Sequence, residues 1–261
     1  GSAQIGVLSS TQVQVLSSAT LNNLSSTTLR AISSADMAVL TSSQIQGLNA
    51  QTLGAFSSGQ VVALSTQELA QLSSTQLGYL GSAQVVALTS AQLVSLSSAQ
   101  TPSLSTAAMA GLNSAQIAAL NNPSSAQIQA ITTAQIAGFP PAVFVGIKQS
   151  IQSVTSAQLS AVSTAGIAVL NSVALGALLT DQIQGLRSDQ IAAITSVQIT
   201  YLTTTDLNAL RSDQLQAITS QDVLQLSSAQ VKSLSSQTLN SLSSAQIGVL
   251  SSTQVRVLSS A

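Results

Sequence analysis

The 261-residue chain contains no cysteine, histidine or tryptophan. The absence of cysteine and histidine excludes zinc sites built from those residues, as well as Ser–His–Asp and Cys–His nucleophile systems. Because there is no cysteine, the sequence does not indicate whether the protein is in a reducing or an oxidising compartment. The composition is equally compatible with the cytosol and with a large secreted bacterial protein. A serine or threonine nucleophile would lack a base to activate it. We therefore expect that the protein is not an enzyme.

Charged and aromatic side chains are also scarce. Charged residues make up 5% of the chain, the formal net charge is −1, and aromatic residues make up 2%. Nucleic acids and anionic membrane surfaces are poor candidate partners, because both are bound by clusters of Lys and Arg. No apolar run approaches the length that crosses a bilayer, and no signal peptide is visible at the start. The apolar fraction of 45% is nevertheless that of a globular protein and argues against simple disorder.

The dominant feature of the sequence is an eight-residue repeat. An apolar residue, usually leucine, returns every eight residues from Leu8 to Leu120, and three extra residues, 121–123, then shift the series. One residue is lost before Val154, after which the spacing of eight holds to Leu258. We count about 32 such units, called octads here, with this apolar residue at position eight. Their consensus is S-S-A-Q-I-x-x-L: position five is apolar almost everywhere, and position four is most often Gln.

A longer repeat is built from the octads. Residues 244–261 reproduce residues 2–19 with one difference, Arg256 in place of Gln14. This similarity exceeds that among the internal octads, and it has two explanations. Either a higher-order repeat of about 242 residues recurs in a much longer parent protein, or the two stretches are similar caps of one solenoid. We favour the higher-order repeat, because solenoid caps usually differ from the repeat and carry a polar outer face.

Three backbone structures compete for the octad. In a β-strand, positions five and eight would point to opposite faces. In one continuous α-helix, the apolar pair would drift by about 80° per octad, and no ordinary partner could cover the winding stripe. The third structure, in which each octad is a separate short helix, places positions five and eight on one face. It also makes position one the N-cap and S-x-x-Q a capping box.

We therefore predict an all-α solenoid, a superhelix of about 32 very short capped helices, one per octad. The apolar rows should stack inside it, with the Ser, Thr and Gln side chains on the exterior. Small residues at positions three and seven should allow neighbouring helices to approach closely. Where Arg187 or Arg211 occupies position one, the following Ser188 or Ser212 is an alternative cap.

The middle of the chain departs from this regularity. All four prolines lie between Pro102 and Pro141, and Pro102 occupies position six, where it should break its short helix. The pair Pro140 and Pro141 predicts one longer helix from about Ala142 to Val154, with proline in its first turn. We predict two regular octad arms, residues 1–120 and 155–261, and an irregular Pro-containing joint over residues 121–154.

Candidate site residues are few. Phe139, Phe144 and Lys148 in the joint could form a docking spot, and the alternative is that the aromatic rings fill the core where the octad pattern changes. We predict no catalytic, cofactor-binding or metal-binding residue. Calcium is the metal to consider, because aspartates cluster in the second half of the chain at positions three and four: Asp181, Asp189, Asp206, Asp213 and Asp222. The sequence around these aspartates has neither the glycine turn nor the D-x-D-x-D-G pattern of calcium loops. We therefore favour the interpretation that they are acidic residues near helix N-termini, where the helix dipole stabilises a negative charge.

The units Leu242–Ile247, Gln84–Leu88 and Arg187–Ile194 resemble octad tracts of the type T-x-x-Q-I-x-x-L. Such tracts occur in very large bacterial surface or secreted proteins, often labelled adhesin-like or haem-utilisation proteins. The resemblance covers essentially the whole chain. It implies an extracellular or cell-surface location and an adhesin-like or matrix role in which length is the useful property. It implies no functional residues, and the lack of histidine argues against haem utilisation.

Two functions are expected from these observations. The first is a non-enzymatic structural segment, a rod, spacer or stalk, whose partners are neighbouring copies of the same repeat, the protein itself or a cell-surface molecule. The alternative is a binding module that holds a peptide or glycan on the solenoid surface or in the 121–154 region. A third possibility, a glycosylated disordered stalk, conflicts with the strict apolar rows at positions five and eight. We expect neither nucleic-acid binding nor membrane insertion.

Overall fold

The computed structural model describes residues 2–120, 125–146 and 149–258. The chain forms two compact units, unit 1 (Gly1–Phe139) and unit 2 (Pro140–Ala261). Within the described residues there are 28 α-helices, four 3-10 helices and no strand. This confirms the predicted all-α solenoid of short helices, and the number of helices matches the estimate of about 32 octads. None of the described helices is long and apolar enough to cross a membrane.

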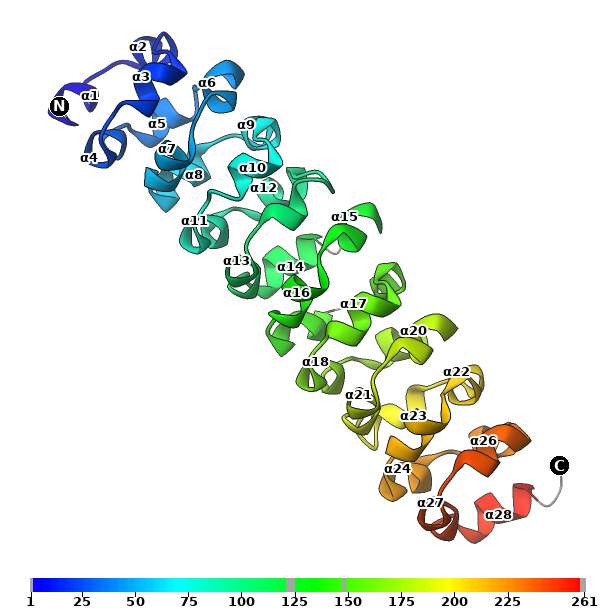
Figure 1. Ribbon diagram of the computed structural model, residues 1–261. Helices are drawn as coiled ribbons and strands as arrows, with labels where there is room; N and C mark the ends of the chain where they lie inside the picture. Colours follow the sequence, from blue (N-terminus) through cyan, green and yellow to red (C-terminus); the bar gives the residue numbers. More distant parts are fainter. Residues whose placement is uncertain (1, 121–124, 147–148, 259–261) are drawn as a thin grey trace. The chain divides into compact units, whose positions relative to one another are not determined.

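The described residues of unit 1 form sixteen α-helices and one 3-10 helix, and Figure 1 shows them in chain order. They are α1 (Ser2–Ile5), α2 (Ser10–Gln14), α3 (Ser18–Asn22), α4 (Ser26–Leu29), α5 (Ser34–Met37), α6 (Ser42–Gln46), α7 (Ala50–Ala55), α8 (Ser58–Ala63), α9 (Thr66–Gln71), α10 (Ser74–Leu77), α11 (Ser82–Ala87), α12 (Ser90–Ser95), η1 (Thr101–Ser103), α13 (Thr106–Ala110), α14 (Ser114–Leu120), α15 (Ser125–Ala130) and α16 (Thr133–Ala137).

The part of unit 2 that the structure describes forms the remaining twelve α-helices and three 3-10 helices. They are η2 (Pro141–Gly146), η3 (Gln149–Ser153), α17 (Ser156–Ala161), α18 (Thr164–Ala168), α19 (Ser172–Gly176), α20 (Thr180–Gly185), α21 (Ser188–Ala192), η4 (Gln198–Tyr201), α22 (Thr204–Ala209), α23 (Ser212–Ala217), α24 (Ser220–Gln225), α25 (Ser228–Lys232), α26 (Ser236–Ser241), α27 (Ser244–Gly248) and α28 (Ser252–Leu258).

In many octads a short helix is followed by a corner of two extended residues. Between α8 and α9 the corner is Leu64, with φ −64° and ψ 138°, and Ser65, with φ −69° and ψ 161°. Two extended residues in succession redirect the chain, so that the next helix starts in a new direction. No described residue has a positive φ, and the corners therefore do not depend on glycine.

The capping box predicted from S-x-x-Q is present. In α12 the backbone N–H of Gln92 donates to the Thr89 hydroxyl at 3.2 Å, while Gln92 Oε1 accepts from the Thr89 backbone N–H at 2.9 Å. The helix start is the same where arginine occupies position one. Arg187 remains the N-cap of α21, and its backbone N–H donates to Gln190 Oε1 at 2.8 Å.

Arg211 caps α23 in the same way, with its backbone N–H bonded to Gln214 Oε1 at 2.8 Å. The alternative start at Ser188 or Ser212 is therefore wrong. The physical reason is that the glutamine at position four accepts from the backbone of position one, which any residue supplies.

Three octads make one turn of the superhelix in each unit. Within each unit, helices pack on the third helix further along the chain: α8 contacts α11 and α9 contacts α12 in unit 1, and α17 contacts α20 and α24 contacts α27 in unit 2 (Figure 1). The 3-10 helices count as members of this series, since α10 contacts η1 and α19 contacts η4. This contact pattern is that of a solenoid in which each octad contacts only nearby octads.

The core of each unit is made from positions five and eight, as predicted. In the octad of α8 these residues are Val61 and Leu64, which are 0% and 3% exposed. The prediction that the position-four glutamines lie on the exterior is wrong, because Gln190 and Gln214 are 0% exposed. A buried amide must be hydrogen-bonded, and these side chains are, as described below.

Small residues at position seven allow successive turns to approach closely. A Cβ added to Gly47 would lie 2.3 Å from the Ser18 hydroxyl oxygen, and one added to Gly185 would lie 2.7 Å from Ser156 Cβ. In both cases the neighbour belongs to the octad three positions earlier, one full turn back. This confirms the role predicted for small residues at this position.

The prolines change the local helix type. Pro102 lies within the 3-10 helix η1, so the octad that carries it has no α-helix, as predicted. The prediction of one longer helix from about Ala142 to Val154 is wrong, because the described residues there form the two 3-10 helices η2 and η3. The position-five residues of the two octads in this segment, Phe144 and Ile151, are nevertheless buried, although they lie seven and not eight residues apart.

The boundary between the two units, at residues 139 and 140, falls inside the predicted joint of residues 121–154. The inserted residues, 121–123, and Lys148 lie outside the described residues. The division into two arms and a joint stays a prediction.

Candidate functional site

The position-four glutamine has a second contact that the capping box does not explain. In addition to its capping bond, its Nε2 group donates to backbone carbonyls of the octad four places earlier, one at position eight and another at position five or six. Gln60 Nε2 lies 2.8 Å from the carbonyl oxygens of both Leu29 and Ile32. Gln84 Nε2 makes the equivalent bonds to Leu53 and Phe56, again at 2.8 Å.

Glutamine suits this position because its amide offers one acceptor oxygen and two N–H donors, and all three are used. The oxygen closes the N-terminus of its own helix, and the two N–H groups close the C-terminus of a helix one turn earlier. We call this series the glutamine ladder. Its described members that donate to an earlier octad are Gln44, Gln60, Gln76, Gln84, Gln92, Gln100, Gln116, Gln135, Gln182, Gln190, Gln198, Gln214, Gln230, Gln246 and Gln254.

The ladder keeps its partners across the three-residue insertion. Elsewhere the position-eight acceptor lies 28 residues before the glutamine and the other acceptor 31 or 30 residues before it, as Leu186 and Ile183 do for Gln214. Gln135 donates instead to Thr101 and Leu104, which are 34 and 31 residues earlier. These acceptors again occupy positions five and eight, so the insertion does not change which octads pair.

An asparagine takes over where threonine replaces glutamine. Thr238 occupies position four of α26, and the cap N–H of Ser235 donates to Asn208 Oδ1 at 2.8 Å instead. Asn208 lies at position six of the octad four places earlier, and also accepts from the Thr238 hydroxyl at 3.0 Å. Its Nδ2 group donates to the Ser233 carbonyl at 2.8 Å. We call this arrangement the asparagine relay.

The asparagine relay recurs in unit 1. Thr52 occupies position four of α7, and the cap N–H of Asn49 donates to Asn22 Oδ1 at 3.0 Å. Asn22 Nδ2 donates to the Gly47 carbonyl at 2.8 Å. In both relays the asparagine precedes the threonine by 30 residues and the cap by 27 residues. Sequence reasoning missed the relay, although this spacing was visible.

Aspartate at position four also acts as a cap. The Asp36 carboxylate accepts from the hydroxyls of Ser33 at 2.6 Å and Ser10 at 2.8 Å. These bonds lower the pKa of Asp36 below its ordinary value, the Ser33 bond most strongly. Asp222 likewise accepts from the Ser196 hydroxyl at 2.7 Å. The aspartates at position four thus stabilise helix N-termini and successive turns.

The aspartates at position three lie on the surface. Asp189 pairs with Arg187 and Asp213 pairs with Arg211, each at 2.9 Å, and all four side chains are about half exposed. The Arg211 guanidinium, helped by the Ser188 hydroxyl, lowers the pKa of Asp213 to about 2. Such exposed pairs stabilise a fold little. No cluster of three or more acidic side chains that could hold a metal ion occurs among the described residues.

The residues predicted as a docking spot are not gathered on the surface. Phe139 and Phe144 are 7% and 6% exposed. A Cβ added to Gly166 would lie 2.9 Å from Phe144 Cδ2, so the ring packs directly against that glycine. Gly166 occupies position four of its octad, where a glutamine would collide with the ring. Lys148 lies outside the described residues, and docking at these residues stays a prediction.

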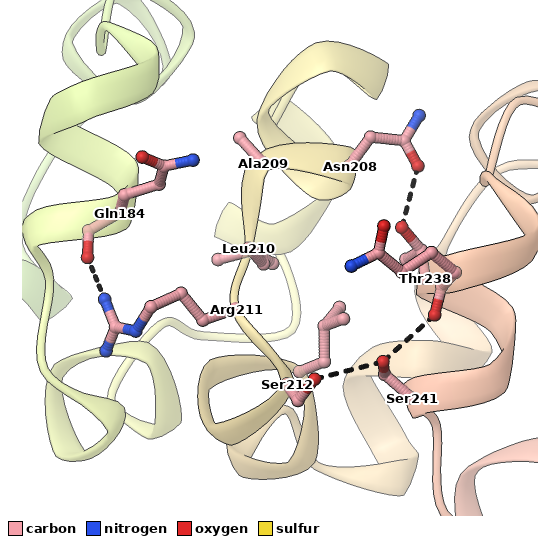
Figure 2. A pocket seen from close by; sticks show the side chains of 10 residues that line it. Gln184, Asn208, Ala209, Leu210, Arg211, Ser212, Thr238 and Ser241 are labelled. Atoms are coloured by element: carbon pink, nitrogen blue, oxygen red, sulfur yellow. Dashed lines mark hydrogen bonds between the residues drawn. The ribbon is translucent and has the colours of Figure 1, made fainter.

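Unit 2 contains a polar pocket of about 300 Å³ between octads one turn apart (Figure 2). Its lining residues are Gln184, Asn208, Ala209, Leu210, Arg211, Ser212, Leu215, Gln237, Thr238 and Ser241. Most of its polar groups bind one another: Arg211 donates to the Gln184 carbonyl, and the hydroxyls of Ser212 and Ser241 are 3.2 Å apart (Figure 2). The pocket also contains the asparagine relay of Asn208.

The ALTTAQ repeat family model matches the chain at two places, residues 53–90 and 223–260. The chain is a repeat protein. One match lies in each unit, and both stretches contain ladder glutamines, among them Gln84 and Gln254. No curated protein matches this repeat protein.

Proposed function

We propose that this repeat protein is a non-enzymatic structural segment, a rod-like spacer or stalk, of a much longer bacterial surface or secreted adhesin-like protein. One segment is a higher-order repeat of about 242 residues, and its partners are neighbouring copies of the same repeat. The extracellular or cell-surface location belongs to the same proposal, as do self-association and attachment to a cell-surface partner. In this role the useful property of the chain is its length.

The observation that carries the proposal is the glutamine ladder. Each ladder glutamine fixes the end of one helix and the start of another a full turn later, as Gln214 does with Ile183 and Leu186. Bending a unit at any point would break buried hydrogen bonds, and an unsatisfied buried polar group costs about 1–3 kcal/mol. The buried glutamine side chains thus connect successive turns along the length of the solenoid.

Small-angle X-ray scattering tests the proposal on two proteins. The first is the chain itself, and the second is a two-copy protein in which residues 20–261 follow directly after Ala261. A spacer predicts that the longest dimension nearly doubles while the cross-section stays constant. A compact two-copy protein, or one that scatters as a flexible coil, would contradict the spacer function.

The binding-module alternative is favoured by one observation, the polar pocket of unit 2. The Gln184 and Gln237 side-chain amides line it and make no hydrogen bond within the described residues, so they could bind the hydroxyls of a glycan or the backbone of a peptide. Titration with a panel of neutral oligosaccharides would test this. Binding that Gln184→Ala and Gln237→Ala abolish supports the alternative, with Lys148→Ala as the matching test of the 121–154 region. If none of the sugars binds the unchanged chain, the pocket has no such role.

A further inference from the structure

Two nearly identical pairs of octads occupy opposite environments in the structure. Residues 2–16 and 244–258 differ only by Gln14 and Arg256. Val13 is 0% exposed, whereas its counterpart Val255 is 50% exposed. The first pair is therefore covered by the octads that follow it, and the second pair lacks such a cover.

The glutamines show the reverse relation. Gln254 is 3% exposed, and its Nε2 donates to the carbonyls of Val223 at 3.2 Å and Leu226 at 2.8 Å. Its counterpart Gln12 is exposed, and Gln12 Nε2 has no partner within the described residues. The second pair is covered by the octads before it, and the first pair is not. Each pair thus has the contacts that the other lacks.

We propose that a second copy of this chain continues the solenoid of the first, and that the two copies share one pair of octads at their junction. Residues 244–258 of the first copy take the place of residues 2–16 of the second, and the second copy continues at Ser17. Val255 is then covered as Val13 is now. This inference rests on the proposed spacer function and specifies the junction between two copies.

Asn240 supports the same register independently. It occupies position six of its octad, its side chain is exposed, and that side chain makes no hydrogen bond in the described structure. In both asparagine relays the asparagine accepts from a cap N–H 27 residues later, and the octad of that cap has a threonine at position four, 30 residues after the asparagine. After a shift of about 242 residues, these places belong to Ser25 and Thr28 of the second copy.

Ser25 and Thr28 have the features that a relay requires. Thr28 occupies position four in place of glutamine, and it is buried. The Ser25 backbone N–H has no acceptor among the described residues, whereas the cap N–H of α12 is bonded to its own glutamine. A junction in which whole copies follow end to end would place Gln12 of the second copy opposite Asn240 instead. Gln12 caps its own helix and needs no relay.

Paired cysteines test the register cleanly, because the chain has no cysteine of its own. In the two-copy protein, Asn240→Cys in the first copy is combined with Thr28→Cys in the second. The pair Asn208→Cys and Thr238→Cys, whose native side chains are 3.0 Å apart, calibrates the yield of disulfide on mild oxidation. The single chain with Asn240→Cys and Thr28→Cys is the negative control. Mass spectrometry measures the oxidised fraction of each protein.

The proposal predicts that the 240–28 cysteine pair across the junction forms a disulfide in a fraction of molecules within about twofold of that of the calibrating pair. In the single chain the same two cysteines should form no disulfide. A two-copy protein with Asn240→Cys and Gln12→Cys, joined with Gly1 directly after Ala261, tests the end-to-end junction. Stronger oxidation of that pair, or none at 240–28 while 208–238 oxidises, would overturn the proposed register. If the 240–28 pair fails but the longest dimension still doubles in scattering, the spacer function stands and the junction alone is wrong.

Discussion

At the scale of single residues, the glutamine at position four is the most important side chain for the structure, because it bonds both its own helix and an earlier turn. Gln214 is fully buried, its oxygen accepts from the Arg211 N–H, and its two N–H groups donate to Ile183 and Leu186. A glutamate in its place would keep the first bond and lose the other two. Its second carboxylate oxygen would then face two carbonyl oxygens.

We therefore predict that Gln214→Glu lowers the free energy of unfolding by about 2–4 kcal/mol at neutral pH, because a buried charge loses its donors. Urea denaturation followed by circular dichroism measures the change. Gln12→Glu is the matched control, since Gln12 Nε2 has no partner within the described residues and only its capping oxygen is used. Equal losses in the two variants would show that the bonds between turns contribute nothing.

The two relay threonines differ in one hydrogen bond. Thr52 Oγ1 is buried without a partner in the described structure, whereas the Thr238 hydroxyl donates to Asn208 Oδ1 at 3.0 Å. We expect Thr52→Val to be neutral or to raise the free energy of unfolding by up to about 1 kcal/mol, since it removes an unsatisfied polar atom. Thr238→Val should lower it by about 1 kcal/mol. Thermal unfolding of the two variants checks this, and the opposite order would refute it.

The pKa of Asp213 reports the contact with Arg211. It is lowered to about 2 from an ordinary 3.8, chiefly by the hydrogen bond from Arg211. Because the folded-state value is the lower one, ionised Asp213 adds stability above about pH 3.8 that is lost as the pH falls through about 2. In Arg211→Met the pKa should rise toward its ordinary value. Carboxyl carbon chemical shifts followed by NMR measure it, and an unchanged pKa would count against the assigned cause.

At the scale of one element, α18 shows how an octad adapts when its glutamine is absent. Gly166 at position four leaves room for the Phe144 ring of an octad one turn earlier. The helix is still capped, since the Gly166 N–H donates to the Ser163 hydroxyl at 3.1 Å. The capping hydroxyl and the apolar pair are thus enough to form the helix, and the glutamine adds the connection to another turn.

We predict that Gly166→Ala lowers the free energy of unfolding by about 1–3 kcal/mol, because the new Cβ would lie 2.7 Å from Val162 Cγ1 and 2.9 Å from Phe144 Cδ2. Gly248→Ala in α27 is the control. Nothing lies within 4 Å of a Cβ at that position, so it should be neutral or stabilise the helix by up to about 1 kcal/mol. Denaturant titration compares them, and a tolerated Gly166→Ala would contradict the close packing of Phe144.

At the scale of the whole molecule, local rules predicted the helices but not how they wind. The capping residues and the apolar pair lie within one octad, so helix positions such as Ser65 to Leu72 follow from sequence alone. Three octads per turn depend on the angle of each corner, which no residue pattern encodes directly. The bonds of Gln60 to Leu29 and Ile32 join residues about one turn apart. They could not be predicted without knowing that one turn contains three octads.

The candidate sites were harder to predict for the same reason. Phe144 was an ambiguous signal, because an aromatic residue in an irregular stretch suits both a docking spot and a core, and burial decides between them only in three dimensions. Asn22 and Asn208 looked like ordinary polar residues at position six. Their role becomes visible only when the octad four places later is known to lie beside them.

Hydrogen exchange of the glutamine side-chain amides, followed by NMR, tests most directly whether the ladder connects successive turns. The amide protons of Gln190 and Gln214 should exchange slowly, because both donate to buried carbonyls. Those of Gln12, which have no acceptor in the described structure, should exchange at the rate of a free side chain. If all three exchange equally fast, the glutamine ladder does not hold the turns together, and the solenoid is not a stiff spacer.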